Sequence, residues 1–229
     1  MWKPMLTLFV ICAFSATTNA DFVTARPADA TTYITAFNSM NATPHGGNAA
    51  IIVDSAGSET SHVLIGFTDL FSGLANTVPA GATIHSAMLN VTTNGNASGE
   101  NIGVRQVSHV WDAATTTWDN FGATAGGSAP EDYFAAAGPN FTPSAANTAF
   151  SIDITSIVAN WAANTSINHG VILVSQDSGS DGAEFFASGS MAPSIDVNFT
   201  AVPEPNAFLM LGLVGLTVGG TRWWKSRMK

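Results

Sequence analysis

Thiols and lysines are nearly absent from this chain, and each absence excludes a kind of chemistry. Among 229 residues there is one cysteine, Cys12, and no lysine lies between Lys3 and Lys225. A single cysteine excludes an internal disulfide and, with it, a small fold held together by disulfides. Without a lysine over most of the chain, Schiff-base and Ser–Lys mechanisms are excluded there as well.

Positive charge is also scarce, and it gathers at the two ends. Five of the seven basic residues lie within the first three or the last eight positions. Between Asp21 and Ala201 there are 15 acidic residues and two basic ones, a formal balance of −13. Such a body repels phosphate backbones, so we expect no nucleic-acid partner. An acidic surface keeps a protein soluble, and it also suits a divalent cation.

Catalytic motifs are missing too. No His-Glu-x-x-His, Gly-x-Ser-x-Gly or phosphate-binding Gly-Lys-Ser/Thr sequence occurs. The histidines are well separated along the chain, at His45, His62, His85, His109 and His169. A glycoside hydrolase needs only two carboxylates, but the sequence marks out no pair among its acids. We therefore predict a protein that is not an enzyme.

The N-terminus has the pattern of a secretory signal peptide. Lys3 supplies the positive charge, Met5–Phe14 is the apolar stretch, and Thr18–Ala20 offers a small-residue cleavage site. We expect residues 1–20 to be removed on export. Because Cys12 lies inside this segment, the exported body would contain no cysteine.

Three consecutive features occupy the C-terminus. Val202-Pro203-Glu204-Pro205 is followed by the apolar run Ala207–Thr221, and then by two tryptophans and four basic residues. The apolar run spans only about 22 Å as a helix, but the tryptophan pair brings it closer to the thickness of a bilayer core, about 30 Å. Clustered Lys and Arg stay on the cytoplasmic side. We expect a transmembrane helix that leaves the acidic body outside the cell.

This C-terminal arrangement resembles the PEP-CTERM sorting signal of Gram-negative bacteria, with all its parts in order over Val202–Lys229. The resemblance implies that, after the secretion machinery has delivered the protein, an exosortase processes it near Val202, Pro203, Glu204 and Pro205. It also implies a final location at the cell surface or in the extracellular matrix. A plain single-span anchor is the alternative interpretation.

Short β-branched runs separated by turn residues fill the region 21–201. This pattern is typical of an all-β sandwich rather than a helical bundle. Within Thr83–Thr92 apolar and polar residues alternate, as in a half-buried strand. The expected strands are Thr31–Thr35, Ala50–Asp54, His62–Phe67, Thr83–Thr92, Ile102–Val107, Ala149–Ile154, Val171–Ser175, Ala183–Ala187 and Ser194–Phe199.

Two segments depart from the strand pattern. Ile157, Val158 and Trp161 have helical spacing, so we expect one short helix with Thr155 as its N-cap, closing one end of the sandwich. The region Ala113–Asn147 is poor in strand signals and rich in Ala, Gly and Pro. We expect a long loop on one face there, and such loops are often binding sites.

The body resembles DNRLRE-type domains, which are grouped with carbohydrate-binding modules of jelly-roll form. The resemblance rests on Pro79–Leu89 leading into the long strand, on Trp111 and Trp118 around threonines, and on Asp153–Thr155 followed by a tryptophan and a glycine. Gly66 departs from it, because many relatives carry an arginine there. The resemblance implies one jelly-roll-like sandwich, so we expect three parts: 1–20, 21–201 and 202–229.

Aromatic residues gather in or beside the expected loop. Sugar-binding modules lay aromatic rings against the apolar faces of sugars, and Trp111, Trp118, Tyr133 and Phe134 are candidates for this role. The tryptophans either do so or pack the loop on the core. The negative charge of the body favours neutral or Ca²⁺-bridged glycans. We therefore hypothesise a polysaccharide-binding surface protein; the alternative is a structural or adhesive surface protein with no specific ligand.

A short acidic segment lies between the last strands. Asp177, Asp181 and Glu184 are separated by four and three positions among glycines and serines. The plainer interpretation is an acidic hairpin turn. The more specific one is a Ca²⁺ site, since hard cations prefer several oxygen ligands from flexible acidic loops.

Overall fold

The structure is a computed structural model that describes residues 20–36, 40–56, 59–97, 99–135, 138–177 and 182–202. Residues 1–19 of the expected signal peptide and residues 203–229 of the expected sorting signal lie outside these ranges, including Pro203, Glu204 and Pro205. So does Asp181 of the acidic segment. Within the described ranges, no helix combines the length and the apolar character needed to cross a membrane.

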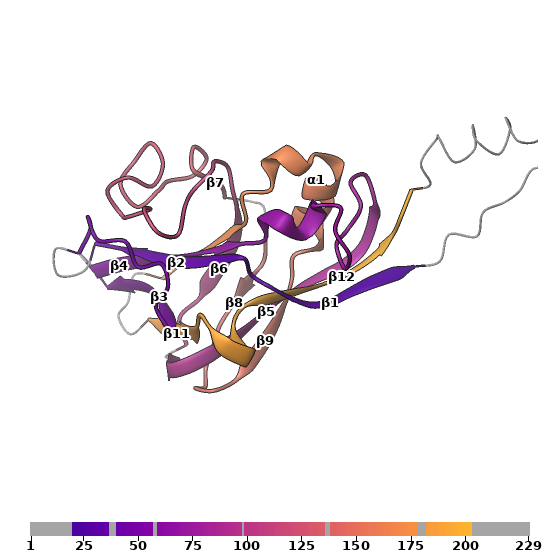
Figure 1. The fold of residues 1–229 in the computed structure, drawn as a ribbon. Helices are drawn as coiled ribbons and strands as arrows, with labels where there is room; N and C mark the ends of the chain where they lie inside the picture. The colour runs from indigo at the N-terminus through magenta and orange to yellow at the C-terminus, as the bar shows by residue number, and fades with distance from the viewer. Residues whose placement is uncertain are drawn as a thin grey trace, which may run out of the picture.

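Antiparallel strands make up most of the described body, and their sheet curls into a half-barrel (Figure 1). The strands are β1 (Asp21–Pro27), β2 (Ala30–Thr35), β3 (Ala50–Ala56), β4 (Glu59–Gly66), β5 (Thr83–Ala97), β6 (Ile102–Val107), β7 (Tyr133–Phe134), β8 (Asn140–Phe141), β9 (Ala149–Asp153), β10 (Val171–Ser175), β11 (Ala183–Phe186) and β12 (Ser194–Thr200). Short 3-10 helices occur at Thr68–Phe71, Thr165–Ile167 and Gly189–Met191. This confirms the expected all-β body with one short α-helix.

The curled sheet encloses one main hydrophobic core. One side of it is β1-β12-β5 with β9, and the other is β2-β4-β10-β6 with β7 and β8. β11 and β3 join the two sides, because β11 pairs with β5 and β3, and β3 pairs with β4. Leu89 and Val197 from one side and Val63 and Leu173 from the other are completely buried in the same cluster.

All nine expected strands are present, and β6 and β10 have the predicted bounds. The sequence did not reveal β1, which pairs with β12 and shifts register between Val23 and Arg26. It also did not reveal β7 and β8, which are two residues long and lie within the expected loop.

The predicted helix is α1 (Thr155–Ala163), and Asn164 is its C-cap. Trp161 on this helix is completely buried in the main core. Thr155 is not the N-cap, however: Ile154 holds that position. The Thr155 hydroxyl donates to Asp153 and accepts from the backbone N–H of Ala87, so it ties α1 to β5 instead.

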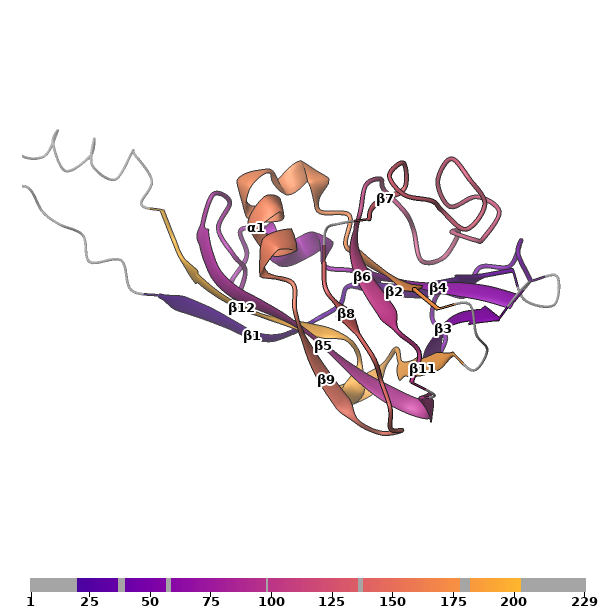
Figure 2. The ribbon, with the colours of Figure 1, turned by 180° about the vertical axis from the view of Figure 1, so that it is seen from behind.

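The long loop covers the outer face of the β2-β4-β10-β6 side (Figure 2). A second buried cluster lies beneath it and contains Ile34, Leu64, Val107, Phe121, Ile172 and Val174. These strands are therefore buried on both faces. This explains why β10 is a continuous apolar run and not an alternating one.

Candidate functional site

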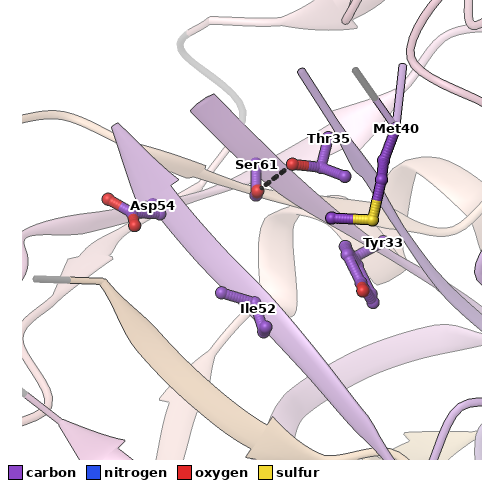
Figure 3. A pocket seen from close by; sticks show the side chains of 6 residues that line it. All are labelled: Tyr33, Thr35, Met40, Ile52, Asp54 and Ser61. Carbon is purple, nitrogen blue, oxygen red and sulfur yellow. Dashed lines mark hydrogen bonds between the residues drawn. The ribbon is translucent and has the colours of Figure 1, made fainter. Parts of the chain in front are cut away.

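A pocket of about 280 Å³ lies across β2, β3 and β4 (Figure 3). Strand register brings its polar residues together, because Ser61 of β4 pairs with Thr35 of β2 on one side and with Asp54 of β3 on the other. Cross-strand partners project from the same face of a sheet. The Ser61 hydroxyl donates to the Thr35 hydroxyl at 2.6 Å. The pocket therefore has a row of side-chain oxygens across its three strands.

The apolar part of the pocket is formed by Tyr33, Met40 and Ile52. Figure 3 shows Met40 next to Tyr33, with Asp54 at the opposite end of the group. The Tyr33 ring stacks on the ring of His45, with centroids 4.1 Å apart and planes 15° from parallel. His45 is only 7% exposed and does not line the pocket, so it supports Tyr33 from behind.

Tyr33 is held in a partly buried, negatively charged environment. Burial raises the pKa of its phenol, a hydrogen bond with the Asn48 side chain lowers it, and the charge of Glu184 raises it. The phenol is therefore neutral and protonated over the whole physiological pH range.

Glu100 contacts β3 through Ser55 and is also partly buried near negative charges. Burial raises the pKa of this carboxyl, and the charges of Asp54 and Asp177 act in the same direction. Hydrogen bonds from Ser175 and Ser55 act against them. Because Asp54 also lines the pocket, negative charge accumulates at that end of it.

Arg105 does not neutralise this charge. Its guanidinium is only 7% exposed and donates to neutral oxygens around β8: the backbone carbonyls of Val104, Gly138 and Pro139, and the side chains of Asn140 and Gln176. Burial lowers its pKa. Among the described residues, those that line the Tyr33 pocket are acidic, aromatic, hydroxylated or apolar.

Two of the four aromatic residues predicted to bind sugar help to hold the loop on the sheet. The Trp111 indole donates to the carbonyl oxygen of His169 at 2.7 Å. The Trp118 ring contacts His62, with ring centroids 5.3 Å apart. Both tryptophans pack against the second buried cluster.

The other two lie side by side on β7. Tyr133 also packs against the second cluster, whereas Phe134 is 45% exposed. The structure thus places the four candidates in or beside the loop, and Phe134 is the most exposed of them.

The pocket around Tyr33 was not predicted from the sequence. Tyr33 is one of only two tyrosines in the chain, and it lies two positions from both Thr31 and Thr35 on the same face of β2. A tyrosine between two threonines on one strand face was the signal that the sequence offered. The partners Asp54 and Ser61 could not be assigned to it, because they depend on the register of three strands.

The described part of the acidic segment takes part in local hydrogen bonds. The Asp177 carboxylate accepts from the backbone N–H of Asn101 at 2.7 Å, and Glu184 accepts from the Asn94 amide at 3.0 Å. Across the described ranges, no three His, Cys, Asp or Glu side chains gather in a way that could hold a metal ion. Since Asp181 lies outside these ranges, Ca²⁺ binding stays a prediction.

Comparison with known proteins identifies the body of the chain. No curated protein matches it. The family model of carbohydrate-binding module family 96 matches residues 23–195, from β1 into β12. The match includes β2 to β11, the covering loop and the described residues of the Tyr33 pocket, and it ends at the start of β12. The chain therefore belongs to carbohydrate-binding module family 96.

Proposed function

We propose that this protein is a non-catalytic surface protein that binds polysaccharide, and that the Tyr33 pocket holds one sugar unit. Membership of a carbohydrate-binding family supports the ligand class. The observation that carries the proposal is the pocket itself, in which an aromatic ring backed by His45 stands near a row of side-chain oxygens.

The chemistry of a sugar fits these groups. A pyranose has an apolar C–H face, which packs on an aromatic ring, and hydroxyls at its edge, which need hydrogen-bond partners. Tyr33 supplies the ring, Ser61 and Thr35 donate or accept, and Asp54 accepts. Pockets for small ligands start at about 300 Å³. The volume of this pocket, about 280 Å³, is at the small end of that range and suits a single sugar ring.

Phe134 is a second proposed contact for a longer polysaccharide. Its ring is exposed, and sugar chains extend over several rings. Trp111, Trp118 and Tyr133 would then act by holding the loop beside it.

Export and sorting complete the proposal. Residues 1–20 would direct secretion, and an exosortase would process the chain near Val202, Pro203, Glu204 and Pro205. The acidic body would then stand at the cell surface or in the extracellular matrix, after transient anchoring in the inner membrane. Support for this part comes from the sequence patterns at the two ends.

A glycan array with the purified full-length chain tests the binding function. We expect retention on at least one polysaccharide, and Tyr33→Ala should weaken it by about tenfold or more. Phe22→Ala is the matched control, because Phe22 is a 56% exposed aromatic residue on β1, away from the pocket. If no glycan is retained, the protein is instead a structural or adhesive surface protein with no specific ligand.

A further inference from the structure

Three residues that lie around Tyr33 come from one short connection between β2 and β3. Residues 40–49 of this β2–β3 connection are described, and they form neither helix nor strand. Met40 lines the pocket next to Tyr33 (Figure 3). The His45 ring stacks on the Tyr33 ring, and the Asn48 side chain forms a hydrogen bond with the phenol. The shape of the pocket therefore depends on where the β2–β3 connection lies.

The covering loop holds this connection through Asp119. The Asn41 side-chain amide donates to both carboxylate oxygens of Asp119, at 2.8 and 2.9 Å. The Asp119 N–H donates in return to the Asn41 carbonyl oxygen at 3.0 Å. Hydrogen bonds to a carboxylate are stronger than those between neutral groups. Because Asn41 directly follows Met40, these bonds fix the side of the pocket next to Tyr33.

A second contact with the loop lies beside His45. At Gly46 the connection approaches the loop so closely that a Cβ there would overlap the carbonyl oxygen of Ala113. Glycine permits this approach, whereas a larger residue would push the connection away from the loop. The connection is thus attached to the loop twice, once next to Met40 and once next to His45.

The loop around Asp119 is fixed by contacts of its own. The Trp118 ring packs against the second buried cluster. The Asn120 side chain accepts from the Thr117 N–H at 2.7 Å and donates to the Thr115 carbonyl oxygen at 3.0 Å. Asp119 lies between these two anchored residues, so it is a fixed point to which the less regular connection is attached.

We propose that Asp119 is a positioning residue for the Tyr33 pocket, and that the covering loop sets the shape of the pocket through it. Asp119 is not among the described residues that line the pocket, so it acts through Asn41 and Met40 and not by contact with sugar. Without the Asn41–Asp119 bonds, Met40 moves relative to the Tyr33 ring, and the surface on which a sugar packs is less well preorganised. The effect on binding rests on the proposed function, whereas the effect on Met40 does not.

Exchange of the two side chains tests this role. Asn41→Asp places a second carboxylate opposite Asp119, where like charges repel, whereas Asn41→Asp/Asp119→Asn restores an amide–carboxylate pair with its positions reversed. Asp119→Ala and Asn41→Asp should each weaken binding by about threefold to tenfold, measured by retention of the full-length chain on the polysaccharide that it binds. The double variant should bind within about twofold of the unmodified chain. Glu131→Ala removes an exposed acidic side chain from the same loop and is the matched control, which should change nothing.

The position of Met40 can be followed without any ligand. In the full-length chain with methyl-labelled methionine, Met40→Leu identifies the Met40 methyl signal, whose chemical shift depends on the neighbouring Tyr33 ring. We expect this signal to move in Asp119→Ala and in Asn41→Asp, and to return in the double variant. Met88 on β5 is an internal reference that should not move. The thermal midpoint shows whether each variant is folded, and the comparison of Asn41→Asp with the double variant gives an answer even if Asp119→Ala does not fold.

The outcomes distinguish the inference from the function beneath it. If the chain binds glycan but either its binding strength or the Met40 signal stays unchanged in Asp119→Ala and Asn41→Asp, the inference is overturned and the proposed function stands. Binding that the double variant does not restore would also overturn the inference, because the pairing would not be what matters. If the unmodified chain retains no glycan, the proposed function is wrong, and the Met40 signal alone decides whether Asp119 shapes the pocket.

Discussion

Tyr33 and His45 form a stacked pair at the back of the pocket, with ring centroids 4.1 Å apart. Buried His45 Nε2 has no hydrogen-bond partner among the described residues, so we infer that its ring contributes mainly as a flat surface. The position of Tyr33 in turn depends on that surface.

The first prediction follows from this stacking. His45→Ala should weaken glycan binding by about threefold to tenfold, because it leaves a gap behind Tyr33 and lets the ring tilt. His45→Phe keeps a flat ring and should retain binding to within about twofold. Affinity electrophoresis in a gel that contains the retained polysaccharide measures both. Equal loss in the two variants would mean that the histidine nitrogens, and not the ring, matter.

The second prediction concerns pH. Burial lowers the pKa of His62 to about 4, and its Nδ1–H donates to the carbonyl oxygen of Gly126 at 2.9 Å. The unfolded chain therefore binds a proton at a pH where the folded chain does not. The resulting stability is present above pH 6.5 and is lost as pH falls toward 4.

The pKa shift of His62 alone would imply a larger effect, but its side chain is only half-buried. We therefore expect the free energy of unfolding to fall by about 2 kcal/mol over this pH range. Urea unfolding at pH 7, 5.5 and about 4 measures it. His62→Gln keeps a donor for Gly126 and does not titrate, so its stability should fall by about 2 kcal/mol less over the same range. If the free energy of unfolding fell equally with pH in the unmodified protein and in His62→Gln, His62 would not be the group responsible.

The third prediction uses the loop glycines. Gly126 has a φ of +78°, and a Cβ there would lie 2.3 Å from the Trp118 ring. Gly126→Ala should therefore cost more than about 2 kcal/mol of unfolding free energy. Gly73 is the matched control: its φ is +75°, but a Cβ meets nothing within 4 Å. Gly73→Ala should cost about 1 kcal/mol, from backbone strain alone. If both variants lost the same unfolding free energy, close packing of Trp118 on Gly126 would not hold the loop in place.

The fourth prediction concerns the buried guanidinium of Arg105. It donates to the carbonyl oxygens of Gly138 and Pro139, next to β8. Arg105→Met fills similar space but removes the Arg105 donor from both carbonyls, which leaves Pro139 with the Val104 N–H alone, and we expect unfolding free energy to fall by about 3 kcal/mol. Gly103 pairs with Asn140 of β8, and the Val104 N–H donates to the carbonyl oxygen of Pro139. The amide hydrogens of Gly103 and Val104 should therefore exchange faster in the variant. Unchanged exchange at both would contradict this role.

The strands were predictable because each carries its own local signal. β10 is four buried apolar residues followed by Ser175, and it was found with its exact bounds. β5 alternates from Ala87 to Thr92 and was found with the correct start, but it continues to Ala97, five residues past the predicted end. The helix around Trp161 was found from its spacing in the same way. The N-cap was misjudged because Thr155 has a better partner in Ala87, 68 positions away in sequence.

The pocket was not predictable for the opposite reason. Tyr33, Asp54 and Ser61 each appear unremarkable within their own strands, and only register places them on one face. The loop aromatics were conspicuous, but a tryptophan that binds sugar and one that packs a loop have the same sequence signal. The structure shows Trp111 and Trp118 in contact with the second cluster, a contact that no local pattern specifies.

β3 changes partners along its length: Ala50–Val53 pairs with β11, and Asp54–Ala56 pairs with β4. Ile52 and Asp54 stand on either side of this changeover. A slight difference in bending here would therefore widen or narrow the gap between Asp54 and Tyr33 while every sugar-facing side chain stayed the same. The fit for a ligand is thus tuned by sheet curvature as well as by residue identity.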